Sequence, residues 1–129
     1  MVKWVLAAGV GFLLGSATTA GLRAPATRAV ALGDLPKPYY RVLWENHEIR
    51  VVEHLLEPGD REPMHFHPRM IGYFLETSTV RVRESNGTTE EAVLAKGTIA
   101  EAGPWTHEIA NIGQTPLHSL IVEFKTERQ

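Results

Sequence analysis

Two histidines, His65 and His67, lie one residue apart near the middle of the chain. In an extended strand alternate side chains leave on the same side, so both imidazoles would point to one face. Pro63 and Pro68 flank the pair. Two imidazoles on one face of a rigid strand are a candidate metal site, and the alternative is two surface histidines on an edge strand. A third histidine further along, His107, favours the metal site.

The segments that would position these histidines have the period of β-strands. Apolar and polar residues alternate in short runs, and turn residues such as Asn86-Gly87 separate the runs. No helical period follows residue 39. Short strands separated by turns predict an all-β sandwich or barrel. The predicted strands cover residues 40–43, 48–56, 65–67, 71–75, 79–83, 88–94, 98–100, 106–111 and 117–125.

The composition limits the function further. A chain of 129 residues has room for one domain with one core. Its formal net charge is −2, and its basic residues form no cluster longer than Arg81 with Arg83, which argues against nucleic-acid binding. The absence of cysteine excludes thiol catalysis, thiolate metal ligands and disulfides.

The N-terminal segment indicates export. Lys3 precedes an apolar run over residues 4–14, and small residues follow, an order typical of a secretory signal. Cleavage would follow Ala20 or Ala31 and release a periplasmic or secreted domain. An uncleaved anchor in the inner membrane is the alternative, because residues 4–22 just reach the roughly 20 apolar residues that span a bilayer. A third alternative is an N-terminal helix without a targeting role.

These observations divide the chain into three parts. Residues 1–31 are a signal peptide or membrane anchor, which would touch a membrane only through residues 1–22. Residues 32–38 are a linker, with two prolines and no periodic apolar pattern. Residues 39–126 are the β-barrel domain.

Two groups of residues carry a resemblance to a known family. The first group contains Gly59, the His65 and His67 pair, Pro68 and the segment 73–76, and the second contains Gly97, Gly103-Pro104, His107 and Asn111. In this order they resemble the two motifs of the cupin superfamily, in particular its small single-domain members (cupin type-2, conserved barrel). The resemblance covers roughly residues 42–124. It implies a double-stranded jelly-roll β-barrel, preceded here by the hydrophobic signal or anchor helix.

The resemblance also implies a metal centre made of His65, His67 and His107. The glutamate that usually joins these ligands would fall on Met70, and no carboxylate lies between Glu62 and Glu76. Three neutral imidazoles suit one divalent transition metal, with Fe(II) favoured and Zn, Cu, Ni or Mn as alternatives. Met70 would be either a weak thioether ligand or an apolar wall residue. No other cofactor site is indicated.

Two further residues are candidates for acid–base or substrate-binding roles. His118 is in phase with Leu120 and Val122 on the last strand, and it would line the cavity if that face points inward. On the alternative interpretation it is a hydrogen-bonded core histidine. Tyr73 would contact a substrate or pack in the core or in a subunit interface. Of the remaining histidines, His54 is expected to be structural and His47 to be solvated.

Two classes of function remain open. One is an exported enzyme of the oxygenase type, with a mononuclear three-histidine centre that acts on a small organic substrate, as the resemblance to dioxygenase-like cupins implies. The other is a non-catalytic periplasmic barrel that binds a metal or a small molecule. An inactive dimeric scaffold is a third alternative. A homodimer is expected in any case, because open strand edges invite pairing.

Overall fold

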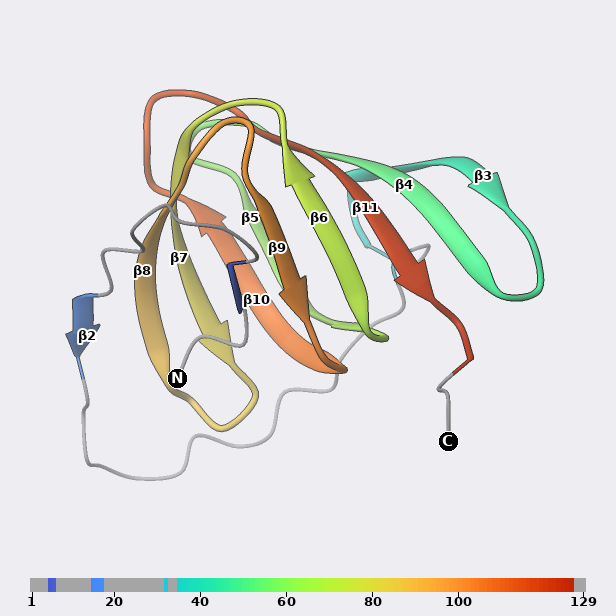
Figure 1. Cartoon of the computed structure of the whole chain (residues 1–129). Coiled ribbons are helices and arrows are strands. Elements are labelled where there is room, and N and C mark those ends of the chain that lie inside the picture. The colour runs from blue at the N-terminus through green and yellow to red at the C-terminus, as the bar shows by residue number, and fades with distance from the viewer. Residues whose placement is uncertain (1–4, 7–14, 18–31, 33–34, 127–129) are drawn as a thin grey trace.

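The computed structural model describes residues 5–6, 15–17, 32 and 35–126 of the chain. Eleven strands in these ranges form two antiparallel sheets that face each other (Figure 1). The predicted N-terminal helix lies outside the described residues, apart from the short segments at 5–6 and 15–17. In the described part of the chain, no helix has the length and hydrophobicity needed to cross a bilayer.

The first sheet has six strands in the order β1-β9-β6-β11-β4-β3. Their bounds are Val5–Leu6 for β1, Ile99–Ala102 for β9, Met70–Phe74 for β6, Leu117–Phe124 for β11, Ile49–Leu56 for β4 and Tyr40–Glu45 for β3. The second sheet has five strands in the order β2-β8-β7-β10-β5. Their bounds are Gly15–Ala17 for β2, Thr89–Leu94 for β8, Ser78–Glu84 for β7, Trp105–Asn111 for β10 and Arg61–His67 for β5.

The all-β prediction is confirmed, and each of the nine segments predicted from period-two alternation overlaps a strand of the structure. Alternate residues of β10 (Trp105, His107, Ile109 and Asn111) are buried, while those between them are half-buried. Apolar and polar residues therefore alternate because one face of each strand packs inside the molecule, as expected.

The apolar core fills the space between the two sheets. Its fully buried members include Val52 and Leu56 of β4, Leu94 of β8 and Trp105 of β10. Leu35, from the segment predicted as a linker, also packs into this core with 9% of its surface exposed.

One residue interrupts the alternation of β5. His107 pairs with His65 but Ile109 pairs with Glu62, so that β5 uses three residues where β10 uses two. This β-bulge adds one residue to β5 and turns Glu62 to the same inner face as His65. Pro63 lies within the bulge of this edge strand, where a residue without an N–H is tolerated.

Gly59 of the first motif and Asn111 of the second motif are hydrogen-bonded to each other at one end of the barrel. Gly59 has a φ of +84° in the turn before β5, a conformation that favours glycine. Its N–H donates to the carbonyl of Asn111, the last residue of β10. The Asn111 amide in turn donates to the carbonyls of Leu56 and Thr115, at 2.9 Å and 2.8 Å. These bonds fix the ends of β4, β5 and β10 relative to one another.

Candidate metal centre

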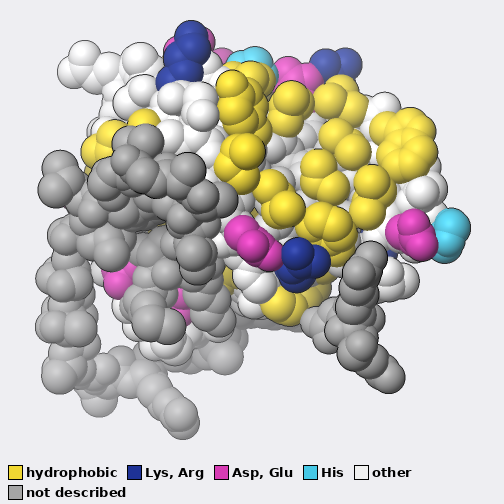
Figure 2. Space-filling model, in the orientation of Figure 1, with side chains coloured by type: hydrophobic (Ala, Val, Ile, Leu, Met, Phe, Trp, Pro, Cys, Tyr) yellow, Lys and Arg dark blue, Asp and Glu magenta, His cyan; other side chains and the backbone are white. Residues whose placement is uncertain are grey.

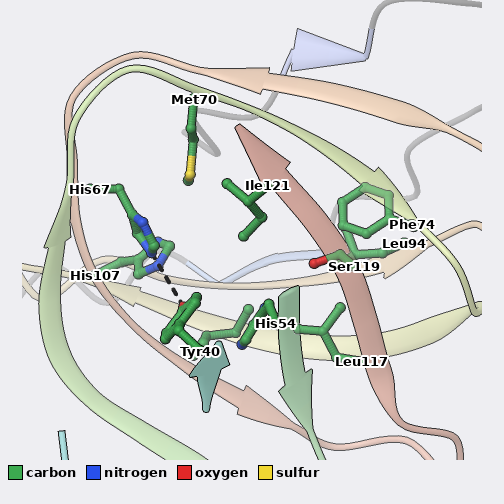
Figure 3. Close-up of a pocket in the computed structure, with 11 residues that line it drawn as sticks. Tyr40, His54, His67, Met70, Phe74, Leu94, His107, Leu117, Ser119 and Ile121 are labelled. Carbon is green, nitrogen blue, oxygen red and sulfur yellow. Dashed lines mark hydrogen bonds between the residues drawn. The ribbon is translucent and has the colours of Figure 1, made fainter. Parts of the chain in front are cut away.

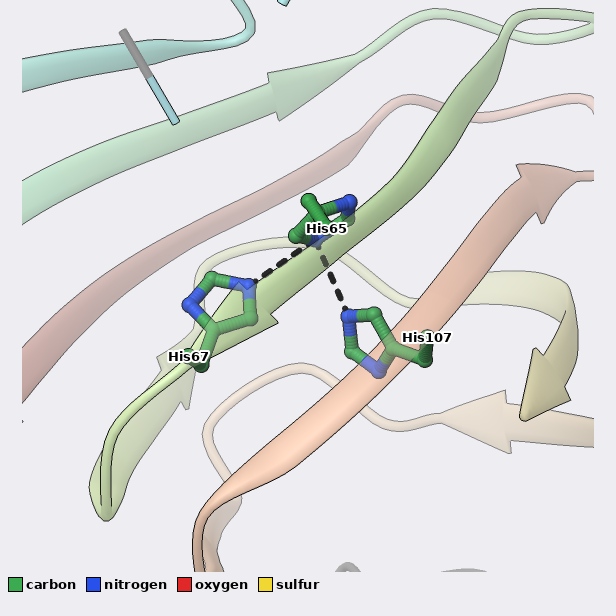
Figure 4. A group of neighbouring side chains, drawn as sticks. All are labelled: His65, His67 and His107. Atoms are coloured by element: carbon green, nitrogen blue, oxygen red, sulfur yellow. Dashed lines mark hydrogen bonds between the residues drawn. The ribbon is translucent and has the colours of Figure 1, made fainter. Parts of the chain in front are cut away.

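The three predicted ligands meet inside the barrel. His65 and His67 point inward from β5, and His107 points toward them from β10, where it pairs with His65 (Figure 4). Nε2 of His65 lies 3.0 Å from Nε2 of His67 and 3.1 Å from Nε2 of His107. All three side chains are buried, with at most 2% of each residue exposed. The strand period and the register of β5 with β10 therefore bring together three imidazoles far apart in sequence.

The outer nitrogens of two ligands are held by acceptors. Nδ1 of His65 donates to the carbonyl of Pro63 at 2.7 Å, and Nδ1 of His67 donates to Oε1 of Glu123 at 2.7 Å. A neutral imidazole carries one proton, so the Nε2 atoms of both rings present lone pairs to each other. Two bare nitrogens 3.0 Å apart repel unless a cation lies between them.

Glu123 is held in turn by Arg50. Nε of Arg50 on β4 donates to Oε2 of Glu123 at 2.7 Å, and the two residues are cross-strand neighbours. Burial raises the pKa of the Glu123 carboxyl, but its bonds to His67 and Arg50 outweigh burial and leave the pKa below the ordinary value. The chain Arg50–Glu123–His67 therefore keeps a carboxylate behind the ligand, an arrangement that orients metal-bound histidines.

Burial also keeps two ligands neutral. It lowers the pKa of His65 to about 4, with the neighbouring His67 adding to the effect. Burial lowers the pKa of His107 well below the ordinary value, and His67 and His65 add to this shift. Neutral imidazole is the form that binds metals, so the site is prepared for a cation at neutral pH.

The hydroxyl of Tyr40 is the fourth polar group at the triad, which consists of His65, His67 and His107. Tyr40 comes from β3 in the other sheet, and its Oη lies 3.3 Å from Nε2 of both His65 and His67. It donates to Oε2 of Glu62 at 2.8 Å. The ring stacks on His54 with centroids 4.4 Å apart and planes 8° apart. Tyr40 is therefore fixed by both its ring and its hydroxyl.

Glu62 completes a second buried chain, Tyr40–Glu62–His54. Oε1 of Glu62 accepts from Nε2 of His54, and its Oε2 lies 3.4 Å from Nε2 of His65. Burial raises the pKa of the Glu62 carboxyl, but the bond and charge of His54, with help from His65 and Tyr40, lower it overall. The triad thus has two neighbouring carboxylates, Glu62 and Glu123. Each of them also accepts a hydrogen bond from a donor outside the triad.

His107 differs from the other two ligands. Within the described part of the chain its buried Nδ1 has no hydrogen-bond partner, and the Trp105 ring packs edge-on against it with centroids 3.9 Å apart. His107 is therefore oriented by packing, whereas His65 and His67 are oriented by hydrogen bonds.

The residues present fit a divalent metal ion. Ligand atoms about 2.1 Å from a transition metal lie roughly 3.0–3.4 Å from one another, and the three Nε2 atoms have this spacing around His65. His65, His67 and His107 form a group of neighbouring metal-ligating atoms in the described residues. The prediction of a three-histidine site is supported in its geometry.

A small apolar cavity adjoins the triad. Its volume is about 10 Å³, room for about one water molecule (Figure 3). Tyr40, His54, His67 and His107 form one side. The remaining wall is mostly apolar and consists of Met70, Phe74, Leu94, Ile109, Leu117, Ser119 and Ile121. Met70 is fully buried in this wall.

The structure does not bring the two other candidates to the triad. Nε2 of His118 donates to Oε1 of Glu53 at 3.0 Å, and 32% of the His118 side chain is exposed. Tyr73 is 42% exposed on β6. The inner residues of β11 are Leu117, Ser119, Ile121 and Glu123, so the face shared by His118, Leu120 and Val122 points outward. His118 therefore points outward and does not line the cavity.

The sequence analysis missed Tyr40, Glu62 and Glu123. These three residues and the Pro63 carbonyl all contact the buried imidazoles. Alternation with Leu117 and Ile121 could have identified Glu123 as an inner residue. No sequence signal gave the bulge that brings Glu62 inward. The expectations for the other histidines agree with the structure, since His54 is buried and the His47 side chain is 85% exposed.

Several solved structures with a similar fold carry the name cupin. A cupin domain from Bordetella pertussis Tohama I has a TM-score of 0.61 and 19% identity, covering 67% of this chain and 92% of that chain. A protein from Thermus thermophilus has a TM-score of 0.51 and 25% identity, covering 77% and 90%. A cupin-like protein from Thermotoga maritima has a TM-score of 0.51 and 21% identity, covering 65% of each chain. In sequence, the chain matches no family model and no curated protein.

The metal-free protein should lose stability as the pH falls from 6.5 to 4. The pKa of His65 is about 4 in the folded state and the pKa of His107 is also lowered, from an ordinary value of 6.5. The unfolded chain therefore binds more protons than the folded chain across this window, which costs at most about 1.4 kcal/mol per pH unit for each histidine. Urea unfolding after chelation at pH 7, 6 and 5 measures the effect.

A matched pair of variants tests the source of that slope. His65→Ala should reduce the slope of the unfolding free energy with pH by an amount that corresponds to about one proton. His47→Ala, at an exposed position, should leave the slope unchanged. A free energy of unfolding that stays constant or rises as the pH falls from 6.5 to 4 would contradict the prediction.

Proposed function

Because the chain has the cupin fold, we propose that it is an exported cupin that binds one divalent transition metal through His65, His67 and His107. The observation that carries this proposal is the pair of Nε2 lone pairs held 3.0 Å apart on His65 and His67, each with its Nδ1 proton already committed. A cation between these nitrogens removes the repulsion, and a third imidazole is in place to join it.

Fe(II) is the metal we favour, with Zn, Cu, Ni and Mn as alternatives. Neutral imidazoles suit all of these ions, and the three-nitrogen set leaves coordination positions open. Such an ion would supply Lewis-acid chemistry and, if it is iron, electron exchange with O₂.

We favour an enzyme of the oxygenase type that acts on a small substrate. The protein residues would orient two imidazoles through Glu123 and the Pro63 carbonyl. The apolar wall that includes Met70 and Ile121 would keep bulk water out of the centre. Tyr40 would supply a fixed polar contact beside the open side of the triad.

A non-catalytic metal- or small-molecule-binding barrel is the second candidate. The observation that favours it is the cavity beside the triad, which has room for about one water molecule. In addition, the structure places neither His118 nor Tyr73 at the triad to serve as an acid or base.

Metal content should depend on the three inner histidines. Protein purified without a nickel column should contain about one metal ion per chain, and His65→Ala, His67→Ala or His107→Ala should each bring it far below one. Glu123→Gln should weaken binding by about 10- to 100-fold, since it removes the carboxylate that orients His67. Elemental analysis and competition with a chelator measure these changes.

The exposed His47 provides the matched control, and His47→Ala should keep full metal content. If His107→Ala kept full metal content, the ligand set would be wrong. Anaerobic loading with Fe(II), followed by measurement of O₂ uptake with candidate substrates, separates the two candidate functions, because the binding barrel should take up none.

The outer face of the first sheet supports the expectation of a homodimer. Trp44, Leu55, Tyr73 and Ile99 are each more than 40% exposed there. They border half-buried Leu120 and Val122 of β11, and Figure 2 shows the resulting apolar patch. Soluble monomers rarely expose an apolar patch of several hundred Å².

Charged pairs of both signs surround this face, including Arg69 with Glu101 and Lys125 with Glu45. Because each positive charge at this rim is paired with a negative one, two copies of the face can pack together without like-charge repulsion. We propose that a second copy of the chain covers this face. A standard interface buries about 800 Å² on each partner.

The dimer should dissociate when a charge enters this face. Ile99→Glu should shift the molar mass measured by light scattering from two chains to one, because it buries an unpaired carboxylate in the interface. Val93→Glu is the matched control, because Val93 is 39% exposed on β8 of the other sheet. A wild-type monomer at high concentration would contradict the proposal.

We also propose that residues 1–31 direct export and that the mature domain is periplasmic or secreted. The support is the order of a basic start, an apolar run and small residues. A reporter active only outside the cytoplasm should work when fused to residues 1–35. Mass spectrometry should find a new N-terminus at Gly21 or Leu32, whereas an intact Met1 in the membrane fraction would indicate the anchor instead.

A further inference from the structure

We propose that Tyr40 determines which small ligand binds at the open side of the triad, by presenting a hydrogen-bond acceptor there and no donor. The inference rests on the proposed metal centre and adds a ligand class to it. The favoured ligand is small, neutral and protic, and a proton-free anion of similar size is disfavoured.

The position of Tyr40 gives it this role. Its Oη is 3.3 Å from Nε2 of His65 and 3.3 Å from Nε2 of His67. An ion held by these nitrogens, and a ligand on its side nearest β3, would therefore be close to the Tyr40 oxygen. Tyr40 and His67 also line the same cavity, and the view into it places the two side chains together (Figure 3).

The hydrogen-bond chain fixes the direction of the hydroxyl. Tyrosine has one hydroxyl proton, and Tyr40 gives it to Oε2 of Glu62 at 2.8 Å. The other carboxylate oxygen accepts from His54, so both partners of Glu62 act as donors. A bond to an ionised carboxylate is about twice as strong as one between neutral groups, so the proton stays on the Glu62 side. Only lone pairs of the Tyr40 oxygen face the triad.

The surroundings prevent Tyr40 from reversing this direction. Glu62 and His54 are buried, at 0% and 4% exposure, and His54 stacks on the Tyr40 ring. Releasing the hydroxyl proton toward the triad would leave a buried carboxylate oxygen without one of its donors, which costs more than an ordinary hydrogen bond. The acceptor character is therefore built into the fold.

The ligand must satisfy this acceptor and fit the space beside it. A small neutral ligand with an N–H or O–H can donate to the Tyr40 oxygen, whereas a proton-free anion would place negative charge against its lone pairs. The adjoining cavity of about 10 Å³, with room for about one water molecule, and its apolar wall favour the smallest ligands. Hydroxylamine and azide are suitable probes, because both are small and bind metals but only the first carries protons that it can donate.

The experiment uses the full chain loaded with Co(II), whose visible spectrum reports each ligand, at pH 7.5. Wild type should bind hydroxylamine in preference to azide. Tyr40→Phe should weaken hydroxylamine binding about 5- to 10-fold, the loss of one hydrogen bond, and should leave azide binding equal or tighter. Glu62→Gln should tighten azide binding, because the amide that replaces the carboxylate can donate to Tyr40 and so turn the hydroxyl proton toward the triad.

Tyr39→Phe is the matched control, because the Tyr39 hydroxyl donates to the carbonyl of Arg61 and does not contact the triad; it should leave both affinities unchanged. Equal preference in wild type and Tyr40→Phe, with one Co(II) bound in each, would overturn the inference and leave the metal centre intact. A tyrosinate charge-transfer band in Cu(II)-loaded wild type that is absent from Tyr40→Phe would also overturn it, since Tyr40 would then be a ligand. Failure of wild type to bind any metal would reject the metal centre and this inference together.

Discussion

The extra residue in β5 is the constraint on which the arrangement around the triad depends. Without the bulge, Glu62 would alternate to the outer face, since it lies three residues before His65. With it, Glu62 and His65 share the inner face, and the carbonyl of Pro63 lies within reach of the His65 ring. A single change of register thus supplies both the acceptor that sets the tautomer of His65 and the carboxylate that holds Tyr40.

The buried charges follow from the same constraint. Two carboxylates, Glu62 and Glu123, lie with 0% exposure beside the triad, and a buried charge is costly unless it is paired and hydrogen-bonded. Each has two donors: His54 and Tyr40 for Glu62, and His67 and Arg50 for Glu123. The imidazole nitrogens therefore face one another without a proton between His65 and His67, and the interior as a whole is arranged for a cation.

Much of this arrangement could be predicted from sequence, and the part that could not has physical causes. Period two identified the strands, and the spacing of His65 with His67 placed both rings on one face, because alternation is a local property. The pairing of His107 with His65 entered through a family resemblance, since register is set by contacts distant in sequence. Glu62 was missed because a bulge breaks alternation without a sequence signal, and Tyr40 because its partners lie on β4 and β5.

Hydrophobicity alone could not show which face of β11, the last strand, points inward. The inner residues of β11 are Leu117, Ser119, Ile121 and Glu123, whereas the outer residues include Leu120, Val122 and Phe124. A strand in a simple sandwich would put its apolar residues inside. Here the inner face must place a carboxylate behind His67, so Glu123 is retained inside, where His67 and Arg50 bind it. The apolar residues that remain lie on the face that we assign to a second copy of the chain. The distribution of polar and apolar residues on β11 is therefore the one expected of a barrel with a polar centre inside and, as we propose, a second copy of the chain outside.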